Sequence, residues 1–371
     1  MVLAGLILAG AVLPIQGPPG NDIELFLVPW MAQIQKQGLS SIAGGFSAYA
    51  PPYIYLLNMA SLLVPSVGIT IAVKLLNVPF VVSLALAIGA IVKDATNDRD
   101  RAQSATAVMF VMPTLQLNAF AWGQADVIYT SFLAWFVYLA MLRQPAAAAI
   151  MFGIALSFKF QAIFLSPLLA YLLLSHQMRV RDALLIPVTY IIMMAPAAFA
   201  GRPWAEIFAI FSHQAGTYHE LSMNAPNPWW FARFMDYRLG VLIGLAAGAA
   251  CGLWIALGAY RAKWPILYVA VLCALVMPFV LPKMHSRYTF VADALVVALA
   301  FTNSRMWPAA VLVQVGSFVA CLSYFFWPMP TAQLGFFPMA AALALILDSN
   351  FGPDLANTEE TAPNSVRGPD R

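Results

Sequence analysis

The amino-acid sequence predicts an all-α, polytopic integral membrane protein of about twelve transmembrane helices. Hydrophobic residues make up 62% of the 371 residues and charged residues 9%, whereas a soluble domain has about 45–50% apolar and about 25% charged residues. So few charges cannot cover a water-soluble globule of this size, and most of the outer surface must therefore face lipid. The net charge of +3 is too small to indicate nucleic acid as a partner.

Apolar runs recur along the whole chain, separated by Pro, Trp and charged clusters. A helix needs about 20 apolar residues to span a bilayer. The runs lie at roughly 1–15, 72–92, 102–121, 126–142, 146–158, 160–174, 183–200, 239–260, 264–281, 289–303, 306–326 and 335–348. We therefore interpret 1–348 as one transmembrane domain. The polar, proline-containing segment 349–371 is expected to be a disordered cytoplasmic tail.

Basic residues predict how these runs are oriented. They occupy alternate connections, which places all of them on the cytoplasmic side under the positive-inside rule. These connections hold Lys93, Arg99, Arg101, Arg143, Arg179, Arg181, Arg261, Lys263 and Arg305. The other connections are then external, and two of them, about 16–52 and 201–238, are long. Long loops held by a rigid helical scaffold commonly carry binding or catalytic sites.

Residues 146–174 are too many for one span and too few for two. A single helix would place Arg143 and Arg179 on opposite sides of the membrane, so we predict two short helices that meet at Lys159. The lysine either points into a cavity, where broken backbone at membrane depth is tolerated, or snorkels to the interface. The sequence favours neither.

Asp22 and Glu24 are the only carboxylates in residues 1–52, and they directly follow the first apolar run. A carboxylate beside a region of low dielectric can act as a general base or accept hydrogen bonds from a sugar hydroxyl. The alternative, which the residues alone favour, is that these acids begin a helix over 23–37.

Two further polar islands are candidates for substrate contact. Residues 118–132 contain Trp122, Gln124, Asp126 and Tyr129, and here Asp126 is expected to organise Gln124 and the neighbouring loop. The loop 201–238 holds amides beside planar aromatic rings, which suit either sugar binding or anchoring at the membrane interface. Its polar and aromatic candidates are His213, His219, Glu220, Asn224, Asn227, Trp229 and Trp230.

The 283–287 turn places Lys283, His285 and Arg287 within five residues. Three potential cations suit a phosphate at headgroup depth, with Arg making bidentate contacts. Binding of ordinary anionic lipid is the alternative. The three cysteines are isolated in apolar runs, so a metal site is not expected.

Taken in order, these islands resemble the GT-C superfamily of integral membrane glycosyltransferases that use polyprenyl-phosphate sugars. They are most similar to bacterial relatives of the dolichyl-phosphate-glucose-dependent glucosyltransferases of N-glycan assembly. The similarity covers about residues 20–305 as an ordered series of motifs. The matching segments are Asn21–Glu24 through Pro29-Trp30, Tyr49–Tyr53, Trp122–Asp126 with Tyr129, Gly153–Gln161, Leu221–Asn227, and Pro282–Tyr288 followed by Ala292-Asp293.

The resemblance implies a GT-C-like fold and a set of functional residues. It places the catalytic base on Asp22, with Glu24 two residues on, and donor-phosphate binding on His285, Arg287 and Lys283, to which we add Lys159 as a further cation. Substrate contacts are expected from Trp122, Gln124, Asp126, Tyr129, Asn224 and Asn227. Ser286 stands where relatives often carry Glu, which leaves the acidic partner of this turn unassigned.

The expected function follows from this assignment. A hexose passes from a polyprenyl-phosphate donor to a lipid-linked or envelope glycan acceptor, with inversion, on the external face of a bacterial inner (plasma) membrane, and neither metal nor cofactor is required. Membrane lipid is the other expected partner. Two alternatives remain open from the sequence: a flippase or transporter of lipid-linked sugars, and a structural subunit of an envelope complex.

Overall fold

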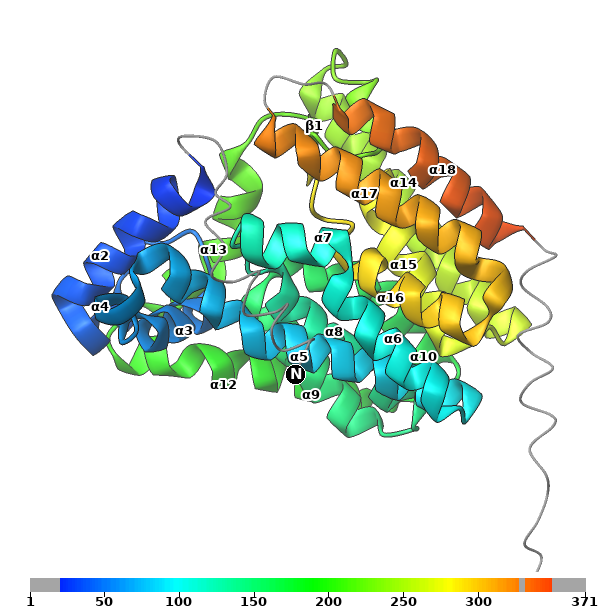
Figure 1. The fold of residues 1–371 in the computed structure, drawn as a ribbon, viewed down its shortest axis with the longest axis horizontal. Helices are drawn as coiled ribbons and strands as arrows, with labels where there is room; N and C mark the ends of the chain where they lie inside the picture. Colours follow the sequence, from blue (N-terminus) through cyan, green and yellow to red (C-terminus); the bar gives the residue numbers. More distant parts are fainter. Residues whose placement is uncertain (1–20, 327–330, 349–371) are drawn as a thin grey trace, which may run out of the picture.

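The computed structural model describes residues 21–326 and 331–348 (Figure 1). The apolar run predicted at 1–15 and the tail predicted at 349–371 lie outside the described residues. Almost all regular structure in the described part is helical, as the composition predicts.

The predicted external loop 16–52 folds mainly as helix where it is described. Gly38 ends the helix α2 (Val28–Gln37) with a positive φ of 58°. Pro51 and Pro52 begin the helix α3 (Pro51–Ser61) at the end of the loop, since proline suits the first helical turn. The elements in this part are η1 (Ile23–Leu27), α2 (Val28–Gln37), η2 (Gly38–Ala43), α3 (Pro51–Ser61) and α4 (Val64–Val67).

The next part of the chain forms helical hairpins. Asp98 caps the N-terminus of α6 (Arg99–Val111), where its side chain accepts hydrogen bonds from two backbone N–H groups. Pro145 begins α9 in the same way that Pro51 begins α3. The elements are α5 (Ile69–Thr96), α6 (Arg99–Val111), α7 (Pro113–Gln116), η3 (Leu117–Ala121), α8 (Asp126–Met141), α9 (Pro145–Phe158), η4 (Phe160–Leu165) and α10 (Ser166–Leu174).

The second half contains the longest exposed helix and the two short strands. Its helices are α11 (Val180–Ala183), α12 (Leu185–Phe199), α13 (Trp204–Thr217), η5 (Pro228–Trp230), α14 (Tyr237–Ala262), α15 (Ile266–Val280), α16 (Phe290–Thr302), η6 (Ser304–Met306), α17 (Trp307–Phe325) and α18 (Thr331–Leu347). The strands are β1 (Ser222–Met223) and β2 (Met284–His285).

Four helical segments are long and apolar enough to cross a membrane: Ile69–Thr96, Val180–Phe199, Tyr237–Ala262 and Ser304–Phe325. The bent pair Arg99–Val111 and Pro113–Ala121 makes a fifth if it is counted as one span. Every described run that the sequence marks falls on helix, but the run 102–121 is a pair of segments bent by 43° and the prediction of about twelve spans is not confirmed. Helices such as α9, with 14 residues, reach only roughly 21 Å at about 1.5 Å per residue, against a hydrocarbon core of about 30 Å.

Burial separates the inner helices from the outer ones. Along α15, Leu267 to Pro278 are buried without interruption, so this helix forms part of the core with α16. By contrast, α14 exposes large apolar side chains such as Leu242, which is 66% accessible. An apolar surface of this kind suits contact with lipid tails.

Two contacts hold the 283–287 turn in place, one with the loop 201–238 and one, just before the turn, with α14. Strand β1 pairs in parallel with β2, so that Met223 lies opposite His285. The glycines of α14 allow the closest approach, because a Cβ on Gly244 would lie 2.4 Å from the ring of Pro282. The turn is therefore held between α14 and the long loop, and its residues line a cavity.

Candidate active site

A cavity of about 1370 Å³ lies where the two predicted long loops meet the helices. Polar side chains line one end of it, including Asp22, Gln124, Lys159 and Arg287. The other end runs between apolar residues of α10 and α14. These apolar lining residues include Ala170, Leu174, Leu245, Ala249, Leu253 and Ala256.

Asp22 is oriented by its neighbours in sequence and in space. The side chain of Asn21 accepts hydrogen bonds from the backbone N–H groups of Ile23 and Glu24, at 3.0 and 3.2 Å. The helix predicted to begin after residues 20–22 does begin there, with Asp22 at its N-terminal boundary, but the side-chain cap bonds come from Asn21 and not from Asp22. Its carboxylate is left to face the cavity.

Two hydrogen bonds and one ion pair meet at one oxygen of that carboxylate. Trp122 donates to Asp22 Oδ2 through its indole N–H at 2.9 Å, and Gln124 donates through its amide at 2.6 Å. The guanidinium of Arg287 lies 3.6 Å from the same oxygen. Within the part of the chain that the structure describes, Oδ1 carries none of these contacts, so it is the oxygen open to a proton.

Glu24, predicted to assist Asp22, is exposed and does not line the cavity. The helical turn that begins at Ile23 rotates Glu24 away from its neighbour. The structure therefore brings only one of the two predicted catalytic acids to the site.

Arg287 lies between two acids. Its Nε is 3.4 Å from Asp126 Oδ2, its Nη1 approaches Asp22, and its guanidinium is 5.1 Å from the centre of the Trp122 ring. The acidic partners left unassigned by Ser286 thus come from two other segments of the chain. A guanidinium can pair with carboxylates or phosphates, and in this structure the two carboxylates are its acidic contacts.

Asp126 and Lys159 form a buried ion pair, in which the lysine ammonium donates to Asp126 Oδ1. The backbone is extended at Lys159, between α9 and η4, so the predicted break between two short helices is confirmed. Lys159 is 8% exposed and lines the cavity, which agrees with the cavity orientation and not with snorkelling.

Asp126 and Tyr129, both predicted to contact substrate, lie behind the cavity wall and are not among its lining residues. Asn118 donates a hydrogen bond to Asp126 Oδ2 at 3.0 Å, and the Tyr129 ring centre is 5.6 Å from the Lys159 ammonium. Asp126 thus holds Asn118 of its own segment together with the two cations. Gln124, which Asp126 was expected to organise, is held by Asp22 and Asn77 instead.

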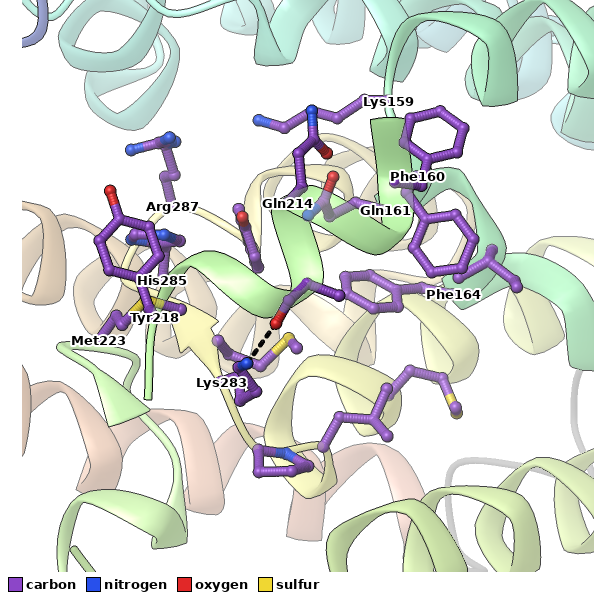
Figure 2. A pocket seen from close by; sticks show the side chains of 18 of the residues that line it. Lys159, Phe160, Gln161, Phe164, Gln214, Tyr218, Met223, Lys283, His285 and Arg287 are labelled. Carbon is purple, nitrogen blue, oxygen red and sulfur yellow. Dashed lines mark hydrogen bonds between the residues drawn. The ribbon is translucent and has the colours of Figure 1, made fainter. Parts of the chain in front are cut away.

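The three cations predicted for the 283–287 turn do not form a cluster (Figure 2). Lys283 donates to the backbone oxygen of Ala215 and, at 2.7 Å, to the hydroxyl of Tyr237. Burial and then the positive charges of Arg287 and Lys159 hold the pKa of His285 well below its ordinary value of 6.5. His285 is therefore a neutral imidazole, suited to hydrogen bonding and not to charge neutralisation.

The two asparagines predicted to contact substrate lie in different surroundings. Asn224 lines the cavity with a positive φ of 60° and forms a backbone bridge to His285. Asn227 is buried away from the cavity, where its amide donates to the backbone oxygens of Pro278 and Leu281 at 3.1 and 3.3 Å. Its contacts therefore fix the loop to the end of α15.

Two aromatic residues outside the predicted set complete the polar end. Tyr49 donates to Gln124 at 3.4 Å, and its place in the segment Tyr49–Tyr53 had marked it in the sequence. Tyr324 accepts a hydrogen bond from the backbone N–H of Asp22 at 2.6 Å. Nothing in the sequence marks Tyr324, because it lies in a run that reads as an ordinary apolar span.

Comparison of the chain with protein-family models and with curated proteins finds no match. In the described residues, no three His, Cys, Asp or Glu side chains gather in the manner of a metal centre. What the site does bring together is a carboxylate with one open oxygen, two cations and an adjoining apolar channel.

Proposed function

We propose that this protein is a GT-C-type membrane glycosyltransferase that transfers a hexose from a polyprenyl-phosphate donor to a lipid-linked or envelope glycan acceptor. One observation carries the proposal. Asp22 lies beside Arg287 at the polar end of a cavity whose other end is apolar. A donor with an anionic group between a sugar and an isoprenoid chain has the same order of chemical groups.

The apolar end of the cavity supports the donor assignment. Residues of α10 and α14 line it, and α14 is a long helix with a largely exposed apolar surface. A hydrocarbon chain that moves there from the bilayer core stays in apolar surroundings, so its binding carries no cost of transfer into water. In this arrangement the phosphate lies near Arg287 and Lys159, where opposite charge stabilises it.

Asp22 and the two cations have different roles in the reaction: Asp22 accepts a proton, and Arg287 and Lys159 stabilise negative charge. Oδ1 of Asp22 removes the proton from an acceptor hydroxyl, whose oxygen forms a bond to the anomeric carbon. The bond between that carbon and the phosphate oxygen breaks, and its electron pair goes to the phosphate. The phosphodiester monoanion becomes a phosphomonoester dianion, and Arg287 and Lys159 stabilise the added charge. In-line attack inverts the configuration of the sugar.

We place the reaction on the external side of a bacterial inner membrane. Consecutive helices joined by short connections run in opposite directions, so the connections alternate between two ends of the bundle. Arg143, Arg179, Lys263 and Arg305 lie in connections of one end, and Asp22, Lys159 and Arg287 lie in connections of the other. The positive-inside rule then supports an external site.

A reconstituted assay tests the proposal. The purified protein in lipid nanodiscs is given a polyprenyl-phosphate hexose with labelled sugar and an envelope glycolipid extract, and products are identified by mass spectrometry. We expect a new glycolipid with the anomeric configuration opposite to that of the donor. Movement of the donor across a vesicle bilayer without a new glycosidic bond would support a flippase instead. Envelope glycolipids that are unchanged in cells lacking the protein would contradict both.

A further inference from the structure

The helix α17 carries a line of polar side chains in an otherwise apolar sequence. Gln314, Ser317, Cys321 and Tyr324 are spaced by three or four residues, so they lie on one face of the helix. Each of them has a partner on another segment of the site end of the molecule. The helix therefore contacts several parts of the site along one face.

The N-terminal members of this line, Gln314 and Ser317, contact the segment that follows the 283–287 turn. Ser317 donates to Asp293 Oδ2 at 2.6 Å and shares a hydrogen bond of 2.9 Å with Thr289. Gln314 donates to the backbone oxygen of Asp293 at 2.8 Å. The thiol of Cys321 donates weakly, at 3.8 Å, to the backbone oxygen of Ser286, directly before Arg287.

The C-terminal member of the line, Tyr324, contacts Asp22. The Tyr324 hydroxyl accepts the hydrogen bond from the Asp22 N–H, and the Tyr324 ring stacks on that of Trp122 with centres 3.9 Å apart and planes 18° apart. Trp122 in turn donates to Asp22 Oδ2. Tyr324 thus restrains both the backbone of Asp22 and the indole that holds its carboxylate.

We propose that Tyr324 is a positioning residue for Asp22, and that α17 aligns the base with Arg287. The inference rests on the proposed function, since it assigns a role within that reaction. Tyr324 acts through Asp22 and Trp122. Its hydroxyl fixes the backbone at the start of the first helical turn, and its ring fixes Trp122. Since a displacement of about 1 Å can cost about 100-fold in rate, loss of these contacts must lower turnover.

The test compares Tyr324→Phe with wild type in the nanodisc assay. The variant keeps the stacked ring and removes the hydroxyl that Asp22 N–H contacts. We expect kcat to fall about 10- to 100-fold, while KM for the polyprenyl-phosphate hexose changes less than about twofold and the melting temperature stays the same. Tyr324→Leu, which also removes the ring, is expected to lower kcat further than Tyr324→Phe.

Tyr260→Phe is the matched control, because Tyr260 is 49% exposed on α14 and should keep wild-type kcat. A Tyr324→Phe variant that turns over as fast as an active wild type would overturn the positioning role and leave the proposed function standing. Loss of kcat, donor affinity and melting temperature together would indicate a structural role and would also overturn it. A wild type that transfers no sugar overturns the proposed function, and the positioning role with it.

Discussion

Asp22 and Asp126 share Arg287, but the surroundings of the two carboxylates differ. The Asp22 side chain is 25% exposed, and its three contacts all fall on Oδ2. The Asp126 side chain is fully buried, and both of its oxygens are engaged, Oδ1 by Lys159 and Oδ2 by Asn118 and Arg287. The first acid can still accept a proton, whereas the second is committed to holding two cations.

The difference shows how neighbouring acids acquire separate roles. An ion pair that is taken out of water has to be complete, because removal of one partner leaves an uncompensated charge. Asp126 therefore sets the places of Lys159 and Arg287 at the cavity wall. The Asp22 carboxylate is partly exposed, so its charge carries a smaller desolvation penalty than the buried charge of Asp126 and does not require a complete ion pair.

The largest effect is expected from Asp22→Asn. The amide keeps the shape of the side chain but cannot take a proton, so transfer should fall about 10²- to 10⁴-fold, with the melting temperature and donor binding unchanged. The measurement is initial rate in the nanodisc assay. Glu24→Gln is the matched control and should stay near the wild-type rate, because Glu24 lies outside the cavity. Equal rates for Asp22→Asn and wild type would remove the assigned base.

Asp126→Asn is expected to act first on stability. It leaves Lys159 and Arg287 without one charge partner, which should lower the free energy of unfolding by about 3–5 kcal/mol. Chemical denaturation in detergent, followed by fluorescence, measures the loss. The double variant Asp126→Asn/Lys159→Met removes both charges of the pair and should recover much of the stability. A single variant as stable as wild type would show that the buried pair is not required.

Arg287→Lys should have a smaller effect than either. Lysine keeps the charge but cannot contact Asp22 and Asp126 through separate nitrogens, so transfer is expected to fall about 10- to 100-fold with a raised donor KM. Lys283→Met provides the comparison, since Lys283 is bound to Ala215 and Tyr237, and its rate should change less than about threefold. If Lys283→Met proved the more damaging, the phosphate would lie nearer to Lys283.

The smallest effect concerns His285 and pH. Its pKa is lowered by burial and then by Arg287 and Lys159, so the unfolded chain takes up the proton first as the pH falls below about 6.5. The contribution of His285 to the free energy of unfolding is therefore fully present above that pH. Below it, this contribution decreases by at most about 1.4 kcal/mol per pH unit. Melting curves at pH 7.5 and 5.5 should show a larger acid-induced loss in wild type than in His285→Asn. Equal losses would mean that His285 is already accessible to protons.

Much of the helical framework could be predicted from the sequence. The described apolar runs coincide with helices, and the break at Lys159 followed from the charges on either side of it. The number of spans could not be predicted in this way. An apolar run of 13 to 16 residues reads the same whether it crosses a bilayer or packs, like α15, inside the protein.

The sequence by itself determined what its local patterns encode: a helical chain with runs apolar enough to cross a membrane, an acid after the first run and a basic turn in the last third. These are local properties, because hydrophobicity and charge act wherever a residue stands. Only the tertiary structure decided the partners. Asn21 supplies the side-chain cap beside Asp22, Glu24 is exposed outside the cavity, and Tyr324 contacts Asp22 although 302 residues separate them. Such contacts depend on how helices pack, and no spacing along the chain records them.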